Sequence, residues 1–333
     1  MKEIVVSGIR STGKLHLGNY FGAVVNFLKM QHEHNSFFFI ADWHSLTTHT
    51  TPVDLQSNVK TVLVEYLAAG LDPEVATLYI QSDIPEIAEL YLYLNMVAYK
   101  GELERVTTFK DKAKSQPDNI NAGLLTYPVL MSADILIHRA TKVPVGKDQE
   151  QHLEMARTFG NRFNHLYKEE FFPEPQAFNF GSKLVKVPGL DGKGKMSKSS
   201  GENTAIFLRD TRDEIIKKMK RSVTDSGPTE PNQAKPEPIQ NLFDLMALVS
   251  TQETYNHFDN LYNTCAIRYG DFKMQLAEDM DAFVAPIREK ITAIENDNDY
   301  IAKALKKGTD TARASAAETI AGVRRLIGFK KFY

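Results

Sequence analysis

The sequence predicts an α/β protein with a doubly wound parallel sheet, followed by an all-helical second domain. Two observations predict this architecture. In the first two-thirds of the chain, short apolar strand-like runs alternate with helical patterns, which is typical of a mostly parallel sheet with helices on both faces. After Lys195 the strand patterns stop, and helical patterns account for most of the remaining sequence.

Four apolar runs are expected to form the strands. The first run, residues 3–7, leads into a glycine and a loop. Three later runs also read as buried strands, and they cover residues 37–41, 76–80 and 143–145. Ligands of such sheets bind beyond the carboxyl ends of the strands, so we expect the functional site in the loops that follow these runs.

Helical patterns separate the strands. Residues 19–31 and 54–69 carry apolar side chains at helical spacing, and Gly70 stands where a C-cap glycine is expected. Pro85 suits the first position of the next helix, because its missing N–H would have no helical partner there. A further helix is expected over residues 149–163.

The last third of the chain is helical in pattern. Thr211 and Glu214 have the spacing of a capping box, which predicts a helix that begins there and ends on basic residues. A proline-rich loop follows over residues 227–238, and helical patterns resume at 241–257, 275–294 and 311–326. These patterns predict three parts: a catalytic domain over 1–199, a helical domain over 200–300, and a C-terminal helix within 301–333 that returns to the first domain.

Composition limits the class of protein. Hydrophobic residues make up 42% and charged residues 25% of the 333 residues, as in ordinary soluble globular proteins. The start of the chain does not resemble a signal peptide, and no apolar stretch is long enough to span a membrane. The single cysteine, Cys265, excludes an intrachain disulfide and any multi-cysteine metal site. These features predict a cytoplasmic protein without a membrane partner, and the net charge of -2 means that RNA binding would need local basic patches.

The first motif, residues 8–19, reads Gly-Ile-Arg-Ser-Thr-Gly-Lys-Leu-His-Leu-Gly-Asn. Its start matches a phosphate-binding P-loop, but Leu15 stands where serine or threonine would hold magnesium, which argues against that class. His16 and Asn19 instead fall near the start of a helix, where the dipole and free amides favour phosphate, and Gly18 leaves room for a purine. The alternative is a glycine-rich turn with a helix-capping asparagine.

The second motif, residues 195–199, reads Lys-Met-Ser-Lys-Ser in a loop rich in lysine and glycine. A flexible loop with ammonium groups can close over pyrophosphate and neutralise the charge that grows on this leaving group. The alternative is an ordinary solvated charged loop.

The ordered pair of motifs resembles the HIGH and KMSKS signatures of class I aminoacyl-tRNA synthetases, with Asn19 in place of the usual second histidine. Further segments are similar to bacterial tryptophanyl-tRNA synthetases. These segments are residues 101–105, 109–112, 124–134, 143–152 and 224–226. The resemblance covers nearly all of the catalytic portion and implies a Rossmann-like catalytic domain.

The resemblance also implies the residues of the site. The expected catalytic residues are His16, Lys112, Lys195 and Lys198. The residues expected to bind ATP are Arg10, Ser11, Thr12, Gly18, Asn19, Gly146, Lys147, Asp148, Val187, Lys195, Met196, Ser197, Lys198 and Ser199. The residues expected to bind tryptophan are His44, Tyr127, Met131, Asp134, Val143 and Val145. For His44, a purely structural role is an equally good interpretation.

Asp134 is expected to accept the indole N–H in an apolar slot. Tryptophan has a single N–H donor on a large apolar body, so one buried carboxylate would be enough to recognise it. Phenylalanine would leave that carboxylate unpaired, which is costly in a buried site. The alternative for Asp134 is a helix cap or a salt bridge.

The activity implied by the resemblance is that of a tryptophan–tRNA ligase, which forms tryptophanyl-adenylate and pyrophosphate from L-tryptophan and ATP and then transfers tryptophan to tRNA(Trp). ATP would be a substrate that brings Mg²⁺ with it, and no protein-held zinc is expected. A homodimer is implied, and the helical domain would read the anticodon. Candidates for its phosphate contacts are Lys217, Lys218, Lys220, Arg221 and Arg268.

Three other functions remain as alternatives. A tyrosyl-tRNA synthetase would share fold and mechanism, but the segment around Asp134 argues against it. A different nucleotidyltransferase with a related histidine motif would not need the helical domain. A non-catalytic RNA-binding paralogue would usually have lost His16 or Lys198, and both are present.

Overall fold

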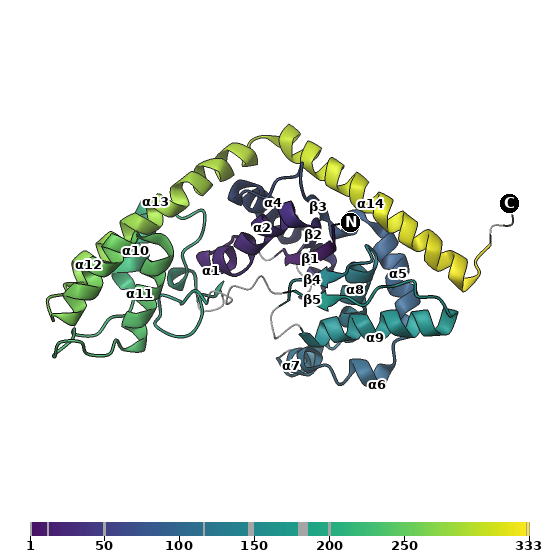
Figure 1. Ribbon diagram of the computed structural model, residues 1–333, viewed down its shortest axis with the longest axis horizontal. Coiled ribbons are helices and arrows are strands. Elements are labelled where there is room, and N and C mark those ends of the chain that lie inside the picture. The colour runs from purple at the N-terminus through teal and green to yellow at the C-terminus, as the bar shows by residue number, and fades with distance from the viewer. Residues whose placement is uncertain are drawn as a thin grey trace.

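A parallel sheet of five strands forms the centre of the molecule (Figure 1). The computed structural model describes residues 2–11, 13–48, 51–115, 117–145, 150–178, 186–198, 201–330 and 332. The strands are β1 (Ile4–Arg10), β2 (Asn35–Ala41), β3 (Thr77–Ile80), β4 (Lys142–Val143) and β5 (Gln176–Ala177). Their order is β3-β2-β1-β4-β5, and every neighbouring pair is parallel. The predicted α/β fold class is therefore confirmed.

Strand order places the switch point of the sheet at β1. The chain adds β2 and β3 on one side of β1 and then returns to add β4 on the other side. A crevice forms where the connections diverge in this way, beyond the carboxyl ends of the strands. The ends of β1 and β4 are therefore where the fold predicts a ligand.

The strands alternate their side chains between two apolar cores. Val5 and Phe38 lie in one core, whereas Val6 and Phe37 lie in the other. The first core contains helices α2 (Val25–Glu33) and α4 (Pro52–Ala69) and continues into the helical region. The second contains α5 (Pro85–Asn95), α8 (Ala122–Leu136) and α9 (Glu150–Tyr167). Burial on both faces explains why the strands read as continuous apolar runs rather than alternating ones.

Shorter helical segments complete the sheet region. They are α1 (Leu17–Asn19), a π-helical turn (Tyr20–Val24), α3 (Asp42–Ser45), α6 (Lys100–Leu103) and α7 (Thr107–Ser115), with 3-10 turns at Leu46–Thr48, Gln81–Asp83, Pro117–Asn119 and Glu202–Thr204. The helix expected over 19–31 thus spans α1, the π-helical turn and α2. The C-cap at Gly70 is confirmed by its φ of 114°.

The helical region comprises α10 (Arg212–Arg221), α11 (Glu237–Val249), α12 (Gln252–Asn263) and α13 (Tyr269–Glu295). Thr211 accepts the Glu214 N–H, and the Glu214 carboxylate accepts the Thr211 N–H, so the capping box at the start of α10 is confirmed. The single helical pattern expected over 241–257 was wrong, because the chain forms two helices there. Thr251 begins the second of them by accepting the Thr254 N–H.

The last helix, α14 (Asn298–Ile327), runs from the end of α13 back over the sheet region, alongside β3 and α5 (Figure 1). Its closest approach to the sheet is at Gly308, where a Cβ atom would lie 1.8 Å from the Leu78 carbonyl oxygen. Among the described residues, five ion pairs add to this contact, namely Lys307–Glu74, Arg313–Glu86, Glu318–Arg139, Arg324–Glu89 and Arg325–Glu169.

Two further expectations need correction. The strand expected over 143–145 is only Lys142–Val143, and β5 beside it was not expected, because strands of two residues leave no periodic pattern to detect. Lys218, expected to contact tRNA phosphate, is buried. Its ammonium donates to Asp210 Oδ2 at 2.6 Å and to the Ala205 carbonyl at 3.0 Å, so it is not available to a ligand.

Candidate active site

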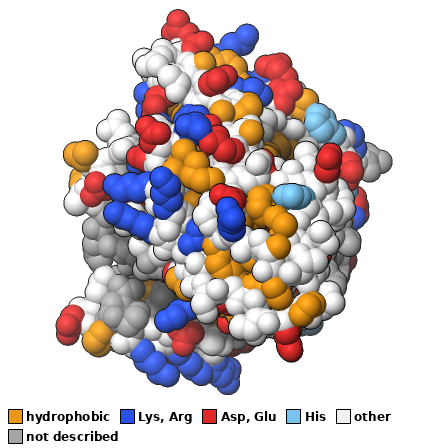
Figure 2. Space-filling model, turned by 90° about the vertical axis from the view of Figure 1, so that its left-hand side faces the viewer, with side chains coloured by type: hydrophobic (Ala, Val, Ile, Leu, Met, Phe, Trp, Pro, Cys, Tyr) orange, Lys and Arg blue, Asp and Glu red, His pale blue; other side chains and the backbone are white. Residues whose placement is uncertain are grey.

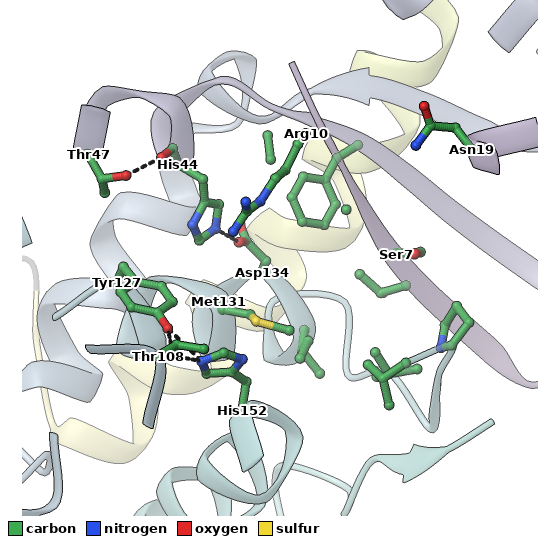
Figure 3. Close-up of a pocket in the computed structure, with 18 of the residues that line it drawn as sticks. Ser7, Arg10, Asn19, His44, Thr47, Thr108, Tyr127, Met131, Asp134 and His152 are labelled. Carbon is green, nitrogen blue, oxygen red and sulfur yellow. Dashed lines mark hydrogen bonds and ion pairs between the residues drawn. The ribbon is translucent and has the colours of Figure 1, made fainter. Parts of the chain in front are cut away.

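A cavity of about 620 Å³ opens at the carboxyl ends of β1, β2 and β4, at the switch point of the sheet (Figure 3). Lining residues of β1 and β2, such as Gly8 and Phe39, meet residues of α8 there. The lining consists of Val6, Ser7, Gly8, Arg10, Asn19, Phe39, Ala41, His44, Thr47, Thr108, Tyr127, Met131, Asp134, Ile135, Val143, Pro144, Val145, His152 and Lys195. Gly8 makes room for the Phe39 ring, because a Cβ atom there would lie 2.6 Å from its edge.

One carboxylate lies among the apolar side chains of this cavity. Asp134 belongs to α8 and is fully buried. Its Oδ2 is 2.8 Å from His44 Nε2, and its Oδ1 accepts a hydrogen bond of 2.7 Å from Gln81 Nε2. Burial raises the pKa of Asp134, and the hydrogen bond from His44 opposes that rise.

Gln81 holds this carboxylate and is itself held by the backbone. Its Oε1 accepts the Trp43 N–H at 3.2 Å while its Nε2 donates to Asp134. Asp134 therefore has two protein donors, and the expectation that phenylalanine would leave it unpaired was wrong. A carboxylate has about four lone-pair sites, so a third donor can still bind.

A second polar cluster faces the same cavity. The Tyr127 hydroxyl lies 2.7 Å from His152 Nε2, and Thr108 Oγ1 lies 2.9 Å from the same nitrogen (Figure 3). Burial raises the pKa of Tyr127. The cavity therefore contains two hydrogen-bonded polar groups, one at Asp134 and the other at Tyr127, Thr108 and His152.

The first motif fixes the ring of His16. His16 is the N-cap of α1: its Nδ1 accepts the Asn19 N–H at 3.3 Å, and Asn19 Oδ1 accepts the His16 N–H at 3.2 Å. Because Nδ1 accepts, the hydrogen of the neutral ring is on Nε2. Burial, with the nearby charge of Lys198, lowers the pKa of His16 to about 4. Gly18 accommodates this ring, since a Cβ atom there would lie 2.8 Å from it.

The two motifs meet in space. Gly18 of the first motif meets Met196 of the second although 178 positions separate them, and the charge of Lys198 contributes to the lowered pKa of His16. Met196 lies against Gly18, and its N–H donates to the Val187 carbonyl at 2.7 Å. Burial lowers the pKa of Lys198 itself. A histidine that donates through Nε2 and a cation thus stand together beside the cavity.

Known proteins resemble this chain over its whole length. A tryptophan–tRNA ligase of Porphyromonas gingivalis is 61% identical over 328 residues, which are 98% of this chain and 100% of that protein. A second such ligase, from Rickettsia bellii, is 42% identical over 99% of both chains. Residues 2–285 match the family described as tRNA synthetases class I (W and Y). The chain belongs to this family.

The solved structures agree with this assignment to the class I tRNA synthetases. The tryptophanyl-tRNA synthetase of Campylobacter jejuni, solved with ADP and tryptophan, has a TM-score of 0.88 and 33% identity over 98% of this chain and 100% of that chain. The chain is therefore an enzyme of this family, and the cavity at the switch point is its candidate active site.

The six residues expected to bind the amino acid all line the cavity of this class I synthetase: His44, Tyr127, Met131, Asp134, Val143 and Val145. Of those expected near ATP, Arg10, Asn19 and Lys195 line it too. Ser11 lies deeper, with its Oγ 2.7 Å from Ser45 Oγ, and the Val187 side chain is buried in the core.

Other expected residues lie outside the described part of the structure. They are Thr12, Gly146, Lys147, Asp148, Ser199 and the side chain of Lys112. Within the described ranges, no group of three or more His, Cys, Asp or Glu side chains could hold a metal ion. In the same part of the chain, every helix is too short or too polar to cross a membrane.

The residues that the sequence analysis missed include Gln81, Thr108 and His152, whose side chains form hydrogen bonds within the site. His152 ends a segment that resembles the family, so it could have been found from that resemblance. Gln81 reaches Asp134 across 53 positions of the chain and Thr108 reaches His152 across 44, and no local pattern marks either residue.

Proposed function

We propose that this protein is a tryptophan–tRNA ligase, which activates L-tryptophan with ATP and transfers it to tRNA(Trp). The observation that carries the proposal is Asp134, a buried carboxylate beside the apolar side chains of Met131, Val143 and Val145 in a cavity of about 620 Å³. A cavity of this size admits an amino acid with a large aromatic side chain. The two relatives named above, both tryptophan–tRNA ligases, support the same function.

Tryptophan binds with its indole N–H toward Asp134. The apolar body of the ring packs between Met131 on one side and Val143 and Val145 on another. Tyr127 belongs to the second polar group of the cavity, which offers partners to the amino and carboxylate groups of the substrate. Because Gln81 and His44 already fix both carboxylate oxygens, Asp134 is oriented before the substrate arrives.

The first step is an in-line attack of the tryptophan carboxylate on the α-phosphorus of ATP, with pyrophosphate as the leaving group. His16 donates a hydrogen bond from Nε2 to a phosphate oxygen, which its fixed tautomer allows at neutral pH. Lys195 and Lys198, with Lys112, neutralise charge on the leaving group. No protein base or covalent intermediate is needed, since positioning and electrostatics dominate such reactions.

ATP lies along the first motif, and the loop of the second motif closes over it. The residues proposed to contact it are Arg10, Ser11, Thr12, Gly18, Asn19, Gly146, Lys147, Asp148, Val187, Met196, Ser197 and Ser199, together with the lysines named above. Magnesium arrives with ATP, held mainly by phosphate oxygens and water.

The second step transfers tryptophan to a terminal adenosine hydroxyl of tRNA(Trp). The helical domain, about residues 200–300, binds the anticodon end, and the C-terminal part from residue 301 braces the catalytic domain. Lys and Arg side chains gather at the helical end of the molecule (Figure 2). Lys217, Lys220, Arg221 and Arg268 are exposed there and are proposed to contact phosphates.

The enzyme acts as a cytoplasmic homodimer. An apolar pocket of about 310 Å³ lies between α3, α5 and α8, lined by Trp43, Leu46, Tyr91 and Leu130 among others. Exposed apolar side chains occur on α5 and just after it, with Leu92 52% and Met96 73% exposed. A second copy would cover this surface, and sedimentation at micromolar concentration tests the mass.

The decisive experiment is ATP–pyrophosphate exchange with each of the twenty amino acids, without tRNA. Exchange with tryptophan alone is the expected result. Exchange with tyrosine would favour the tyrosyl-tRNA synthetase alternative and refute the role of Asp134. Absence of exchange with and without tRNA would favour a non-catalytic paralogue.

A further inference from the structure

A buried carboxylate outside the cavity holds the first motif. Glu65 lies on α4 and is fully buried. Its Oε2 accepts the Leu15 N–H at 2.5 Å, one residue before His16. Leu15 is itself only 5% exposed, so without Glu65 its N–H would lose its acceptor in a buried environment.

The other oxygen of Glu65 belongs to an ion pair with the chain that follows the second motif. Arg209 donates from Nε to Glu65 Oε1 at 2.5 Å and from Nη1 to Glu295 Oε2 at 2.9 Å. Glu295 is the last residue of α13. One carboxylate therefore connects the first motif, the segment after the second motif and the longest helix of the helical region.

Backbone bonds show what this connection holds in place. The Leu208 N–H donates to the Leu15 carbonyl and the Leu17 N–H to the Ile206 carbonyl, each at 2.9 Å, on either side of an antiparallel bridge between His16 and Phe207. Glu65 accepts the Leu15 N–H, which has no backbone acceptor in this short ladder. The backbone around His16 is thus fixed by residues 206–208, which follow the second motif, and by Glu65.

We propose that Glu65 is a positioning residue for adenylation: by accepting the Leu15 N–H it fixes His16 opposite the cation of the second motif, while Arg209 neutralises the buried charge of Glu65. The proposal rests on the proposed function. A charge is not required for the Leu15 bond, only an acceptor, whereas the charge of Glu65 is required to match Arg209.

Two double variants separate positioning from general stability. Glu65→Leu with Arg209→Met replaces the ion pair by apolar side chains and leaves the Leu15 N–H without an acceptor. Glu65→Gln with Arg209→Met differs only in retaining an acceptor oxygen. Replacement of a buried ion pair by apolar residues is commonly tolerated, so both variants are expected to fold.

Tryptophan-dependent exchange is the first measurement. We expect kcat of the leucine variant to fall about tenfold or more, with KM for tryptophan within about twofold, and the glutamine variant to stay within about threefold of the unmodified enzyme. Equal kcat values in the two variants would overturn the proposal, whether both are active or both are lost together with thermal stability.

Amide hydrogen exchange at Leu15, measured without substrates, tests the same contact independently of activity. Faster exchange is expected in the leucine variant than in the glutamine variant, and equal protection would overturn the proposal. An unmodified enzyme that shows no pyrophosphate exchange would refute the proposed function, whereas a difference between the variants in hydrogen exchange would still establish the contact of Glu65 with the first motif.

Discussion

Replacing Asp134 by asparagine should remove the preference for an indole N–H. Asparagine has nearly the same shape, and its amide oxygen can still accept from Gln81, so the fold should be retained. The negative charge that would receive the indole N–H is lost. A hydrogen bond to a charged group contributes about 1.5–3 kcal/mol, which corresponds to about tenfold to about 150-fold in kcat/KM.

The assay compares tryptophan with an analogue that has sulfur in place of the N–H, 3-(benzothiophen-3-yl)alanine. The ratio of their kcat/KM values in pyrophosphate exchange isolates the single donor, because the two side chains have similar size and apolar surface. We expect the unmodified enzyme to favour tryptophan by that factor and Asp134→Asn to bring the ratio close to one. An unchanged ratio would refute the assignment of Asp134.

Asp42→Asn is the matched control. Asp42 is also buried at the end of β2, but it does not line the cavity. Its Oδ1 accepts the N–H groups of Trp43 and Ser82 at 3.0 and 3.1 Å, and an asparagine oxygen can accept both. The substrate ratio should therefore stay within about twofold in this variant.

Three other predictions concern catalysis, packing and pH. Lys198→Ala should lower kcat of exchange by about 100-fold, with the dissociation constant of tryptophan unchanged, because the lysine acts on the leaving group. Gly308→Ala should lower the free energy of unfolding by about 1–3 kcal/mol, since its Cβ would overlap the Leu78 carbonyl. Burial lowers the pKa of His138 from 6.5 to about 3. Between pH 6.5 and about pH 3, the unfolded chain therefore binds a proton at His138 that the folded chain does not. The contribution of His138 to the free energy of unfolding should be fully present above pH 6.5 and decrease as the pH falls below it. Urea unfolding should show a loss of about 2 kcal/mol from this group between pH 7 and pH 5.

Each of these has a control. Lys220→Ala, an exposed lysine of α10, should leave exchange without tRNA unchanged, and an equal loss there would contradict a specific role for Lys198. Gly270→Ala meets nothing within 4 Å and should change stability by less than about 0.5 kcal/mol; a loss equal to that of Gly308→Ala would contradict the packing argument. His138→Phe should keep the stacking on Phe37 and reduce the dependence on pH, and a pH dependence identical to that of the unmodified protein would rule out His138 as its source.

The sequence by itself determined the local features of this protein. Apolar runs that alternate with helical patterns predicted the parallel sheet. Four consecutive residues predicted the capping box of Thr211 and Glu214. The first and second motifs identified the family, because their residues are close together in the chain. Such features depend on spacing and residue type within a few positions, which a sequence records directly.

Only the tertiary structure decided which distant groups meet. Three hydrogen bonds join residues 53, 50 and 144 positions apart, and they are Gln81–Asp134, Glu65–Leu15 and Arg209–Glu65. The burial of Lys218 against Asp210 likewise follows from packing of the helical region around a side chain that, in sequence, resembles any other basic helix end. These contacts depend on how whole elements pack, and a buried polar group gives no local pattern that distinguishes it from an exposed one.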